Sequence, residues 1–154
     1  NSNPPMCYIS IRPERHSHAI LKKNRAFVIN LTTGRLAHAT DWCGVRSGRD
    51  YDKFKEMQLT PGKGQILKTP LIEESPLHLE CKVKDIISLG SHDMFLGEII
   101  AVSADSAYMD EETNQYNLAA SGLMTFIHGR YYKVAGKLGK FGFSVKGTKR
   151  QSKK

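Results

Sequence analysis

The stretch CGVRSGRDYDKF, residues 43–54, concentrates side chains that can bind an anion. Arg49 and Lys53 supply positive charge, and Ser47 supplies a hydroxyl group in the same loop. Cys43 precedes them and would act as a nucleophile only as a thiolate. Such a loop is typical of a phosphate-binding site, and equally of a polar surface turn with solvated charges. The loop by itself leaves both interpretations open.

A second group of the same chemistry lies in IRPERHS, residues 11–17. Arg12 and Arg15 follow a short apolar stretch, and Ser17 is a candidate N-cap for the helix expected next. Free backbone N–H groups at a helix start favour an anion, and arginine adds bidentate hydrogen bonds. A surface turn again remains the alternative, but two such clusters together favour a ligand that carries phosphate.

Signatures of other catalytic chemistry are scarce. The sequence contains no nucleophile elbow, no Walker loop and no pair of histidines at metal spacing on a helix. On a helix, His16 and His18 would point to different sides, so we expect no metal site. Cys43 would lie at a helix C-terminus, which raises a thiol pKa and favours a packing role. His92 lies in a tight turn and is either a turn residue or, at the mouth of a barrel, a ligand contact.

Length and composition indicate one soluble globular domain. The 154 residues are 40% hydrophobic and 25% charged, and no apolar run approaches the roughly 20 residues of a membrane helix. The formal charge is +8, but the last nine residues, KGTKRQSKK, carry five of the positive charges. The chain also lacks the interleaved aromatic residues that nucleic-acid-binding barrels use for stacking. We therefore disfavour nucleic acid as a partner.

The cysteines and the first residues carry further information. Three widely spaced cysteines form neither a zinc pattern nor a disulfide framework, which favours the reducing cytoplasm. The sequence begins with NSNPP rather than Met and enters a β-prone stretch almost at once. We therefore expect the chain to begin within a domain.

Residue patterns predict a β-rich domain with short helices. Residues 77–89, LHLECKVKDIISL, alternate in polarity and predict a strand whose wet face carries His78 and Glu80 as well as two lysines. The turn GSHD leads to an antiparallel partner over 94–105, in which Gly97 marks a bulge or a close approach. Two more strands are predicted over 6–11 and 26–31, and helices over 18–23, 35–43 (closed by Gly44) and 51–57 (capped by Asp50 or Ser47). Residues 124–135 predict another strand or a hairpin, with Gly129 near the turn.

Several blocks together resemble the flavin reductase-like proteins with an FMN-binding split barrel, nearest to their flavoredoxin-like branch. The blocks are PPMCYISIRPERHS, FVINL, CGVRSGRDYDKF, IEESPLHLECKV, LGSHDMFLGEI and KLGKFGFSV. The resemblance implies a mainly β fold: an antiparallel six-stranded Greek-key split barrel with short helices, usually a homodimer. It further implies that residues 1–145 form an FMN-binding domain that lacks the family's N-terminal strands, followed by a basic tail at residues 146–154.

The resemblance also implies roles for individual residues. The FMN phosphate would bind at Arg12, Arg15 and Ser17, and Asn30 would line the flavin pocket. The loop that covers the flavin would contain Cys43, Ser47, Arg49 and Lys53. His92 would lie near the flavin ring on the nicotinamide side. Lys53 or Arg49 would stabilise the reduced, anionic flavin, unless the two residues form salt bridges with Asp50 and Asp52.

Two functions follow as hypotheses. The first is an NAD(P)H-dependent flavin reductase-like oxidoreductase, in which electrons pass from NAD(P)H through FMN to an acceptor, with His92 and Lys53 as catalytic candidates. The alternative is a non-catalytic, flavoredoxin-like electron-transfer protein that receives electrons from another redox protein. The absence of a GxGxxG turn does not separate them, because split barrels do not use that fold for dinucleotides.

Overall fold

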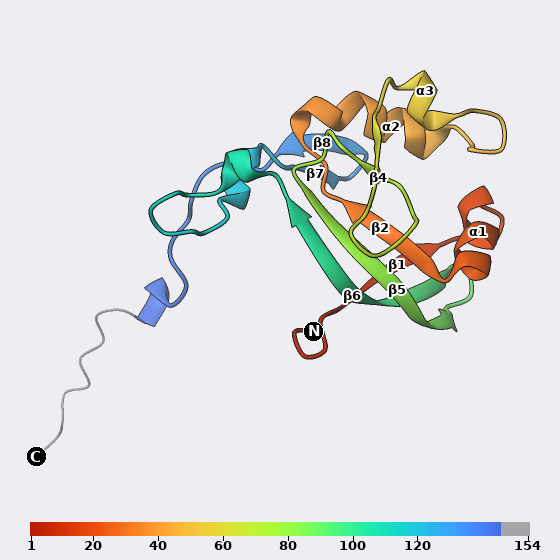
Figure 1. The fold of residues 1–154 in the computed structure, drawn as a ribbon, viewed down its shortest axis with the longest axis horizontal. Coiled ribbons are helices and arrows are strands. Elements are labelled where there is room, and N and C mark those ends of the chain that lie inside the picture. The colour runs from red at the N-terminus through yellow and green to blue at the C-terminus, as the bar shows by residue number, and fades with distance from the viewer. Residues whose placement is uncertain (146–154) are drawn as a thin grey trace, which may run out of the picture.

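Four strands form one curled antiparallel sheet in the computed structural model, which describes residues 1–145 (Figure 1). The predicted basic tail at residues 146–154 lies outside the described residues. The strand order across the sheet is β1 (Met6–Ile11), β6 (Asp93–Ala104), β5 (Leu77–Ser88) and β2 (Ala26–Asn30). The β5–β6 hairpin thus lies between two strands that are joined to each other through helix α1 (His16–Asn24).

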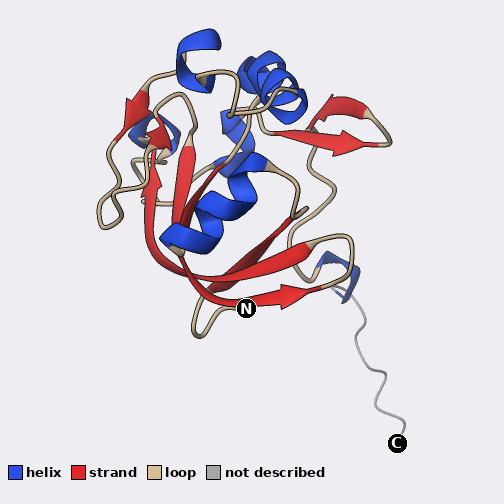
Figure 2. Ribbon diagram, turned by 90° about the vertical axis from the view of Figure 1, so that its right-hand side faces the viewer, coloured by secondary structure: helices blue, strands red, loops and turns tan. Residues whose placement is uncertain are grey.

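Helix α1 packs inside the curve of the sheet (Figure 2). Its Leu21 joins Phe27, Val83 and Phe95 in the buried cluster, together with Cys81. Because a nine-residue helix gains little stability by itself, this apolar contact is what holds α1 on the sheet. The first residues of α1 are thereby fixed near the ends of β1 and β5.

Gly97 allows this close packing, as the sequence predicted. A Cβ at Gly97 would lie 2.8 Å from Cζ of Phe27 and 3.2 Å from Cβ of Cys81. Cys7 and Cys81 lie on the two strands that flank β6, with their Sγ atoms 3.5 Å apart. Burial, together with the neighbouring Cys7, raises the pKa of Cys81 to about 12, so its thiol stays neutral.

The second face of β5 is covered, so the predicted wet face is wrong for two residues. His78 and Glu80 are only 8% and 1% exposed. The carboxylate of Glu80 accepts hydrogen bonds from the backbone N–H groups of residues 65, 66 and 67, at 2.6, 3.0 and 2.6 Å. Burial alone would raise the pKa of Glu80, but these three bonds lower it overall. A carboxylate with three donors stays charged although it is buried.

Helix boundaries differ from the prediction in ways that follow from capping. Helix α1 begins at His16, so Ser17 lies inside its first turn and is not the N-cap. Helix α2 runs over Ala37–Val45 after a 3₁₀ turn at Gly34–Leu36, so Gly44 lies within the helix instead of ending it. Helix α3 spans only Lys53–Glu56, because Asp52, rather than Asp50 or Ser47, accepts the capping hydrogen bonds from Phe54 and Lys55.

The remaining elements lie outside the curled sheet. Two short ladders pair β3 (Pro61–Gly62) with β4 (Leu71–Ile72), and β7 (Met124–Ile127) with β8 (Arg130–Lys133). The β7–β8 hairpin confirms the predicted turn, where His128 and Gly129 have φ values of 48° and 78°. Three further 3₁₀ turns cover Ser106–Tyr108, Leu118–Ser121 and Phe143–Val145, the last of which lies away from the sheet (Figure 1).

The mainly β, antiparallel split-barrel fold is therefore confirmed, with four strands in the curled sheet. The strands predicted over 6–11, 26–31, 77–89 and 94–105 are each confirmed, with both ends within one residue of the prediction. Among residues 1–145, no helix has the length and apolar character needed to cross a membrane.

Candidate functional site

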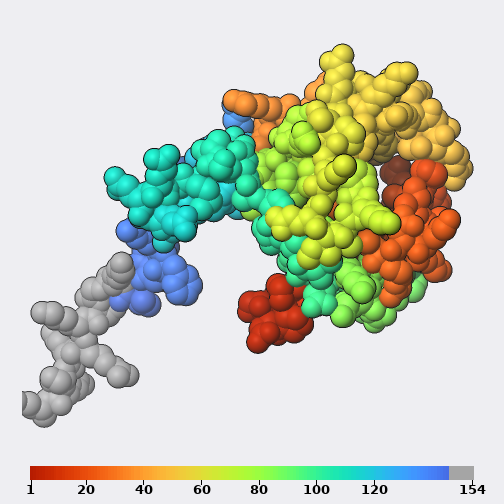
Figure 3. Space-filling view, viewed as in Figure 1, coloured from red at the N-terminus to blue at the C-terminus, as the bar shows by residue number. Residues whose placement is uncertain are grey.

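A cavity of about 910 Å³ lies between the start of α1 and the loop that follows α2. Figure 3 shows the hollow between these two segments on one side of the molecule. Residues 10–20 form one wall, residues 43–53 form the other, and His92 reaches the cavity from the β5–β6 turn. Three segments that are far apart in the sequence therefore meet at one site.

Most of the predicted site residues line this cavity. The residues that do so are Arg12, Arg15, Ser17, Cys43, Ser47, Arg49, Lys53 and His92. Asn30 does not line it, because its Oδ1 accepts a hydrogen bond from the backbone N–H of Ile72 at 2.9 Å. Asn30 thus holds β4 beside β2. The roles predicted for these residues stay predictions, since their placement alone does not identify a ligand.

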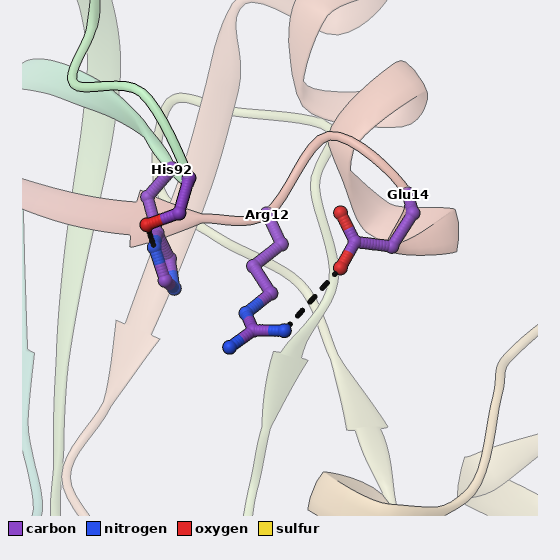
Figure 4. Close-up of polar contacts among 4 residues, drawn as sticks. Arg12, Glu14 and His92 are labelled. Atoms are coloured by element: carbon purple, nitrogen blue, oxygen red, sulfur yellow. Dashed lines mark hydrogen bonds and ion pairs between the residues drawn. The ribbon is translucent and has the colours of Figure 1, made fainter.

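The α1 wall presents Arg12 and Arg15 on the segment between β1 and the helix. Arg12 forms an exposed ion pair with Glu14, with 3.6 Å between Nη1 and Oε1 (Figure 4). Arg15 occupies the N-cap position, and its side chain makes no capping hydrogen bond. The guanidinium of Arg15 and the first N–H groups of α1 are thus available to an anion.

His92 approaches the same wall from the hairpin turn (Figure 4). Its Nδ1 lies 2.9 Å from Oγ of Ser91, and its backbone carbonyl accepts a hydrogen bond from Leu89. The side chain is half-buried, so the turn fixes the imidazole and leaves part of it facing the cavity.

The opposite wall is a well-ordered loop. The carbonyl of Ser47 accepts from the N–H groups of Asp50 and Tyr51, and its Oγ accepts from the N–H of Arg49 at 3.1 Å. The ring of Tyr51 makes an edge contact with Trp42, with 5.3 Å between ring centroids. These bonds give the loop one conformation although its side chains are mostly exposed.

Arg46 lines the cavity but was not assigned a role from the sequence. Its guanidinium lies over the ring of Tyr51, 5.8 Å from the centroid. The signal was present in the opening motif, where Arg46 is the first of its cations, but the family resemblance gave that residue no role.

Lys53 joins the last turn of α2 to the start of α3. Its Nζ donates a hydrogen bond to the carbonyl of Cys43 at 2.5 Å, where a helix C-terminus favours a cation. Burial raises the pKa of the Cys43 thiol, and the charge of Lys53 offsets this only in part. Cys43 is therefore a neutral thiol near pH 7, which agrees with the expected packing role.

The two walls touch at Gly48 and His16. A Cβ at Gly48 would lie 3.4 Å from Cδ2 of the His16 ring and 3.9 Å from Cε of Lys53. The absence of a side chain at Gly48 allows the loop to approach α1 this closely. The contact bounds the cavity on one side.

Positive charge dominates the cavity. Its cations are Arg12, Arg15, Arg46, Arg49 and Lys53, and its carboxylates are Glu14 and Asp52. Within the described residues, only Arg12 among these cations has a carboxylate within 4.0 Å, so the alternative in which Lys53 and Arg49 pair with Asp50 and Asp52 is wrong. Unpaired cations around a cavity repel one another, and an anionic ligand relieves that repulsion.

A second cavity of about 530 Å³ lies between the start of α2 and the loop before β5. Its lining includes Arg35, three carboxylates and Tyr108, and none of the predicted site residues. Over residues 1–145 no three histidine, cysteine or acidic side chains are grouped as metal ligands would be. His16 lines the first cavity, whereas His18 is buried on the sheet, so the two histidines do not converge.

The family described as "Flavin reductase like domain" matches residues 1–135 of the chain. Among curated relatives, the chain is 30% identical over 108 residues to an uncharacterized protein of Archaeoglobus fulgidus, which covers 70% of this chain and 61% of the relative. It is 27% identical over 104 residues to the reductase component of a 4-nitrophenol monooxygenase of Rhodococcus opacus, covering 66% of this chain and 51% of that protein. The chain spans 38% to 61% of the length of its relatives at 30% identity or more.

Solved structures share the fold over most of the chain. The flavoredoxin of Desulfovibrio vulgaris (Miyazaki F) is 26% identical, with a TM-score of 0.86, and the match covers 95% of this chain and 79% of that one. An FMN-binding protein from Thermus thermophilus is also 26% identical, with a TM-score of 0.76 and coverage of 91% and 75%.

Proposed function

The chain belongs to the family of flavin reductase-like domains, and on this premise we propose that it binds FMN and passes electrons from NAD(P)H through the flavin to an acceptor. The observation that carries the proposal is the convergence of three cation-bearing or imidazole-bearing segments on one cavity. The similarity to an FMN-binding protein and to a monooxygenase reductase component supports the choice of ligand and reaction.

The cavity has the size and charge that FMN requires. About 910 Å³ falls within the ~300–1,000 Å³ range of cofactor sites. Five cations against two carboxylates match a ligand that carries a phosphate and gains further negative charge on reduction. These residues therefore fit an anionic flavin better than a neutral ligand of the same size.

We assign the FMN phosphate to the wall formed by the start of α1, and the flavin ring to the opposite wall. Arg12, Arg15 and the first N–H groups of α1 bind the phosphate, and Ser17 in the first turn adds a hydroxyl group. Lys53 and Arg49 lie on the other wall and stabilise negative charge near the flavin ring. His92 contacts the ring side from the hairpin turn. The bound flavin supplies the electron chemistry, so none of these side chains has to act as an acid or base.

A second candidate is an electron carrier without a pyridine-nucleotide reaction. The similarity to flavoredoxin favours this alternative. The same cavity would then bind FMN, and another redox protein would supply the electrons. The two candidates share the flavin site and differ only in the donor.

We further propose a homodimer in the cytoplasm. The hairpin β7–β8 and the residues after it expose large apolar side chains to solvent, including Phe126, Leu138, Phe141 and Phe143. Leu138 is 97% exposed, which is costly for a leucine in a chain that has no partner. A second copy of the chain would cover such side chains in a two-fold interface.

The test uses the purified protein. FMN titration, followed by flavin fluorescence, should show saturable binding, and the loaded protein should oxidise NADH or NADPH when a ferric or flavin acceptor is present. FMN binding without pyridine-nucleotide oxidation would select the electron carrier. No binding of FMN at all would reject both candidates.

A further inference from the structure

His18 and Asp93 form a buried polar pair beneath the cavity. Nε2 of His18 lies 2.8 Å from Oδ2 of Asp93, and the two side chains are only 10% and 16% exposed. The ring of His18 also makes an edge contact with Phe95, with 5.4 Å between ring centroids. Phe95 is fully buried, so the imidazole has little freedom to rotate. The pair thus has one defined geometry.

Asp93 lies where the end of β1, the β5–β6 turn and helix α1 meet. It is the first residue of β6 and pairs across the sheet with Ile11 of β1 and Ser88 of β5. Ile11 directly precedes Arg12, and Asp93 directly follows His92. His18 lies in α1, two residues after the start of the helix at His16. One hydrogen bond therefore ties the helix to the strand end that precedes Arg12 and to the turn that carries His92.

We propose that His18 is a positioning residue for the flavin site, which holds the phosphate wall on α1 in a fixed relation to His92. The inference rests on the proposed FMN function, because it assumes that the ligand phosphate binds at the start of α1. His18 does not line the cavity. It acts through Asp93, and its hydrogen bond fixes the distance between two groups that contact one ligand.

The physical reason is the cost of losing the partner. If His18 cannot bind Asp93, a mostly buried carboxylate loses its closest charged or polar partner. The start of β6 must then move toward solvent or α1 must shift, and either movement displaces Arg15 relative to His92. A displacement of about 1 Å is enough to weaken a bidentate contact strongly.

The test compares His18→Phe with His18→Gln. Phenylalanine keeps the ring and its contact with Phe95 but cannot hydrogen-bond to Asp93, whereas the amide of glutamine can donate to the carboxylate. His78→Phe is the matched control, because His78 is also 8% exposed and bonds to the carbonyl of Ile72 at 2.8 Å, but does not line the cavity. Asp93→Ala breaks the same bond from the other side and serves if His18→Phe does not fold.

The readout is the dissociation constant for riboflavin divided by that for FMN, both measured by fluorescence titration. The melting temperature of each variant is measured as well. A wild-type preference for FMN should fall roughly tenfold in His18→Phe and in Asp93→Ala, because a charged hydrogen bond is lost. It should be retained in His18→Gln and in His78→Phe, even if His78→Phe melts as early as His18→Phe. An unchanged ratio in His18→Phe, or an equal fall of the ratio in His78→Phe, would overturn this inference and leave the proposed function standing. A wild-type protein with no preference for FMN would overturn the phosphate assignment of the proposed function and this inference with it.

Discussion

Lys53 reaches back across the loop and donates its Nζ hydrogen bond to the carbonyl oxygen of Cys43 at 2.5 Å. The bond ties the end of α2 to the start of α3, and so closes the loop that forms one wall of the cavity. Lys53 consequently has a structural partner and faces the cavity as well. Its substitution should affect both stability and the flavin.

Lys53→Met should lower the reduction potential of bound FMN by some tens of millivolts, since a nearby cation stabilises the reduced, anionic ring. A differential interaction of about 1.4 kcal/mol corresponds to roughly 30 mV for a two-electron couple. The lost hydrogen bond should also lower the unfolding free energy by about 1 kcal/mol. Redox titration and thermal melting measure the two effects. Lys55→Met, on the same helix but outside the cavity lining, should leave the potential where it was; a lowered potential there would point to a non-local effect of charge.

Arg12→Ala should weaken FMN binding about tenfold and change riboflavin binding little, because only FMN carries the phosphate to which a guanidinium can hydrogen-bond. Substitution of Glu14, the ion-pair partner of Arg12, should change FMN affinity in the opposite direction. Glu14→Gln releases Arg12 from its exposed partner, and so should tighten FMN binding slightly, by less than about fivefold. Competitive titration with both ligands measures each constant. Equal losses for FMN and riboflavin in Arg12→Ala would remove Arg12 from the phosphate site.

Gly97→Ala should destabilise the fold by about 1–3 kcal/mol, because the added methyl group overlaps a buried ring. Its Cβ would lie 2.8 Å from Cζ of Phe27, which the surrounding core prevents from moving away. Gly44→Ala is the control: no atom lies within 4 Å of its Cβ position, and it lies within α2, so it should stabilise by about 0.5–1 kcal/mol. Urea unfolding of both variants checks the sign. If Gly97→Ala left the unfolding free energy unchanged, the core around Phe27 would be able to repack.

Glu80 should make the stability of the protein depend on pH. Its pKa is lowered in the folded state, despite burial, by the three backbone N–H groups of residues 65–67. A lowered pKa contributes stability that is fully present above the unfolded value of about 4.3, and that is lost as the pH falls through the folded value. The difference in melting temperature between wild type and Glu80→Gln should therefore be largest above about pH 5 and shrink in acid. A difference that stays constant down to pH 3 would exclude this role of the carboxylate.

The exposed apolar side chains after β7 predict the assembly state. Sedimentation at micromolar concentration should give a dimer, because the exposed apolar side chains would be buried between two copies of the chain. A stable interface of this kind needs roughly 1,000 Å² or more of buried surface. Leu138→Ser combined with Phe141→Ser should shift the protein toward the monomer without loss of circular dichroism, because both side chains are almost fully exposed within the single chain. A wild-type protein that sediments as a monomer with flavin bound would contradict the proposed dimer.

The sequence predicted the strands of the curled sheet well for one reason. Apolar and β-branched runs such as Met6–Ile11 have few alternatives to a buried strand, and their ends are marked by Pro13 and by polar residues. Charged residues that directly follow such strands must lie at the sheet ends. Arg12, directly after β1, and His92, directly before β6, both line one cavity, in agreement with that argument.

The errors arose where a long-range contact decides the environment. His78 and Glu80 alternate with apolar residues and look exposed, but the backbone N–H groups of residues 65–67 bond to Glu80, and the carbonyl of Ile72 bonds to His78. Nearly every residue type has a backbone N–H group, so the polarity pattern of a segment cannot show which of these groups will cover a distant side chain. The register shift between Glu80 and Cys81 also breaks the strict alternation. The partner of Asn30 is likewise a backbone group, the N–H of Ile72, which the sequence does not reveal.

The order of strands in the sheet has a consequence for synthesis on the ribosome. Strand β1 leaves the ribosome before any other strand described, yet all its partners lie in β6, with Met6 opposite Glu98 and Ile11 opposite Asp93. Within the described residues, β1 therefore has no sheet partner until some eighty further residues are translated, at a rate of about 5–20 residues per second. During those seconds β1 is an exposed strand edge of the kind that chaperones bind and that aggregation exploits.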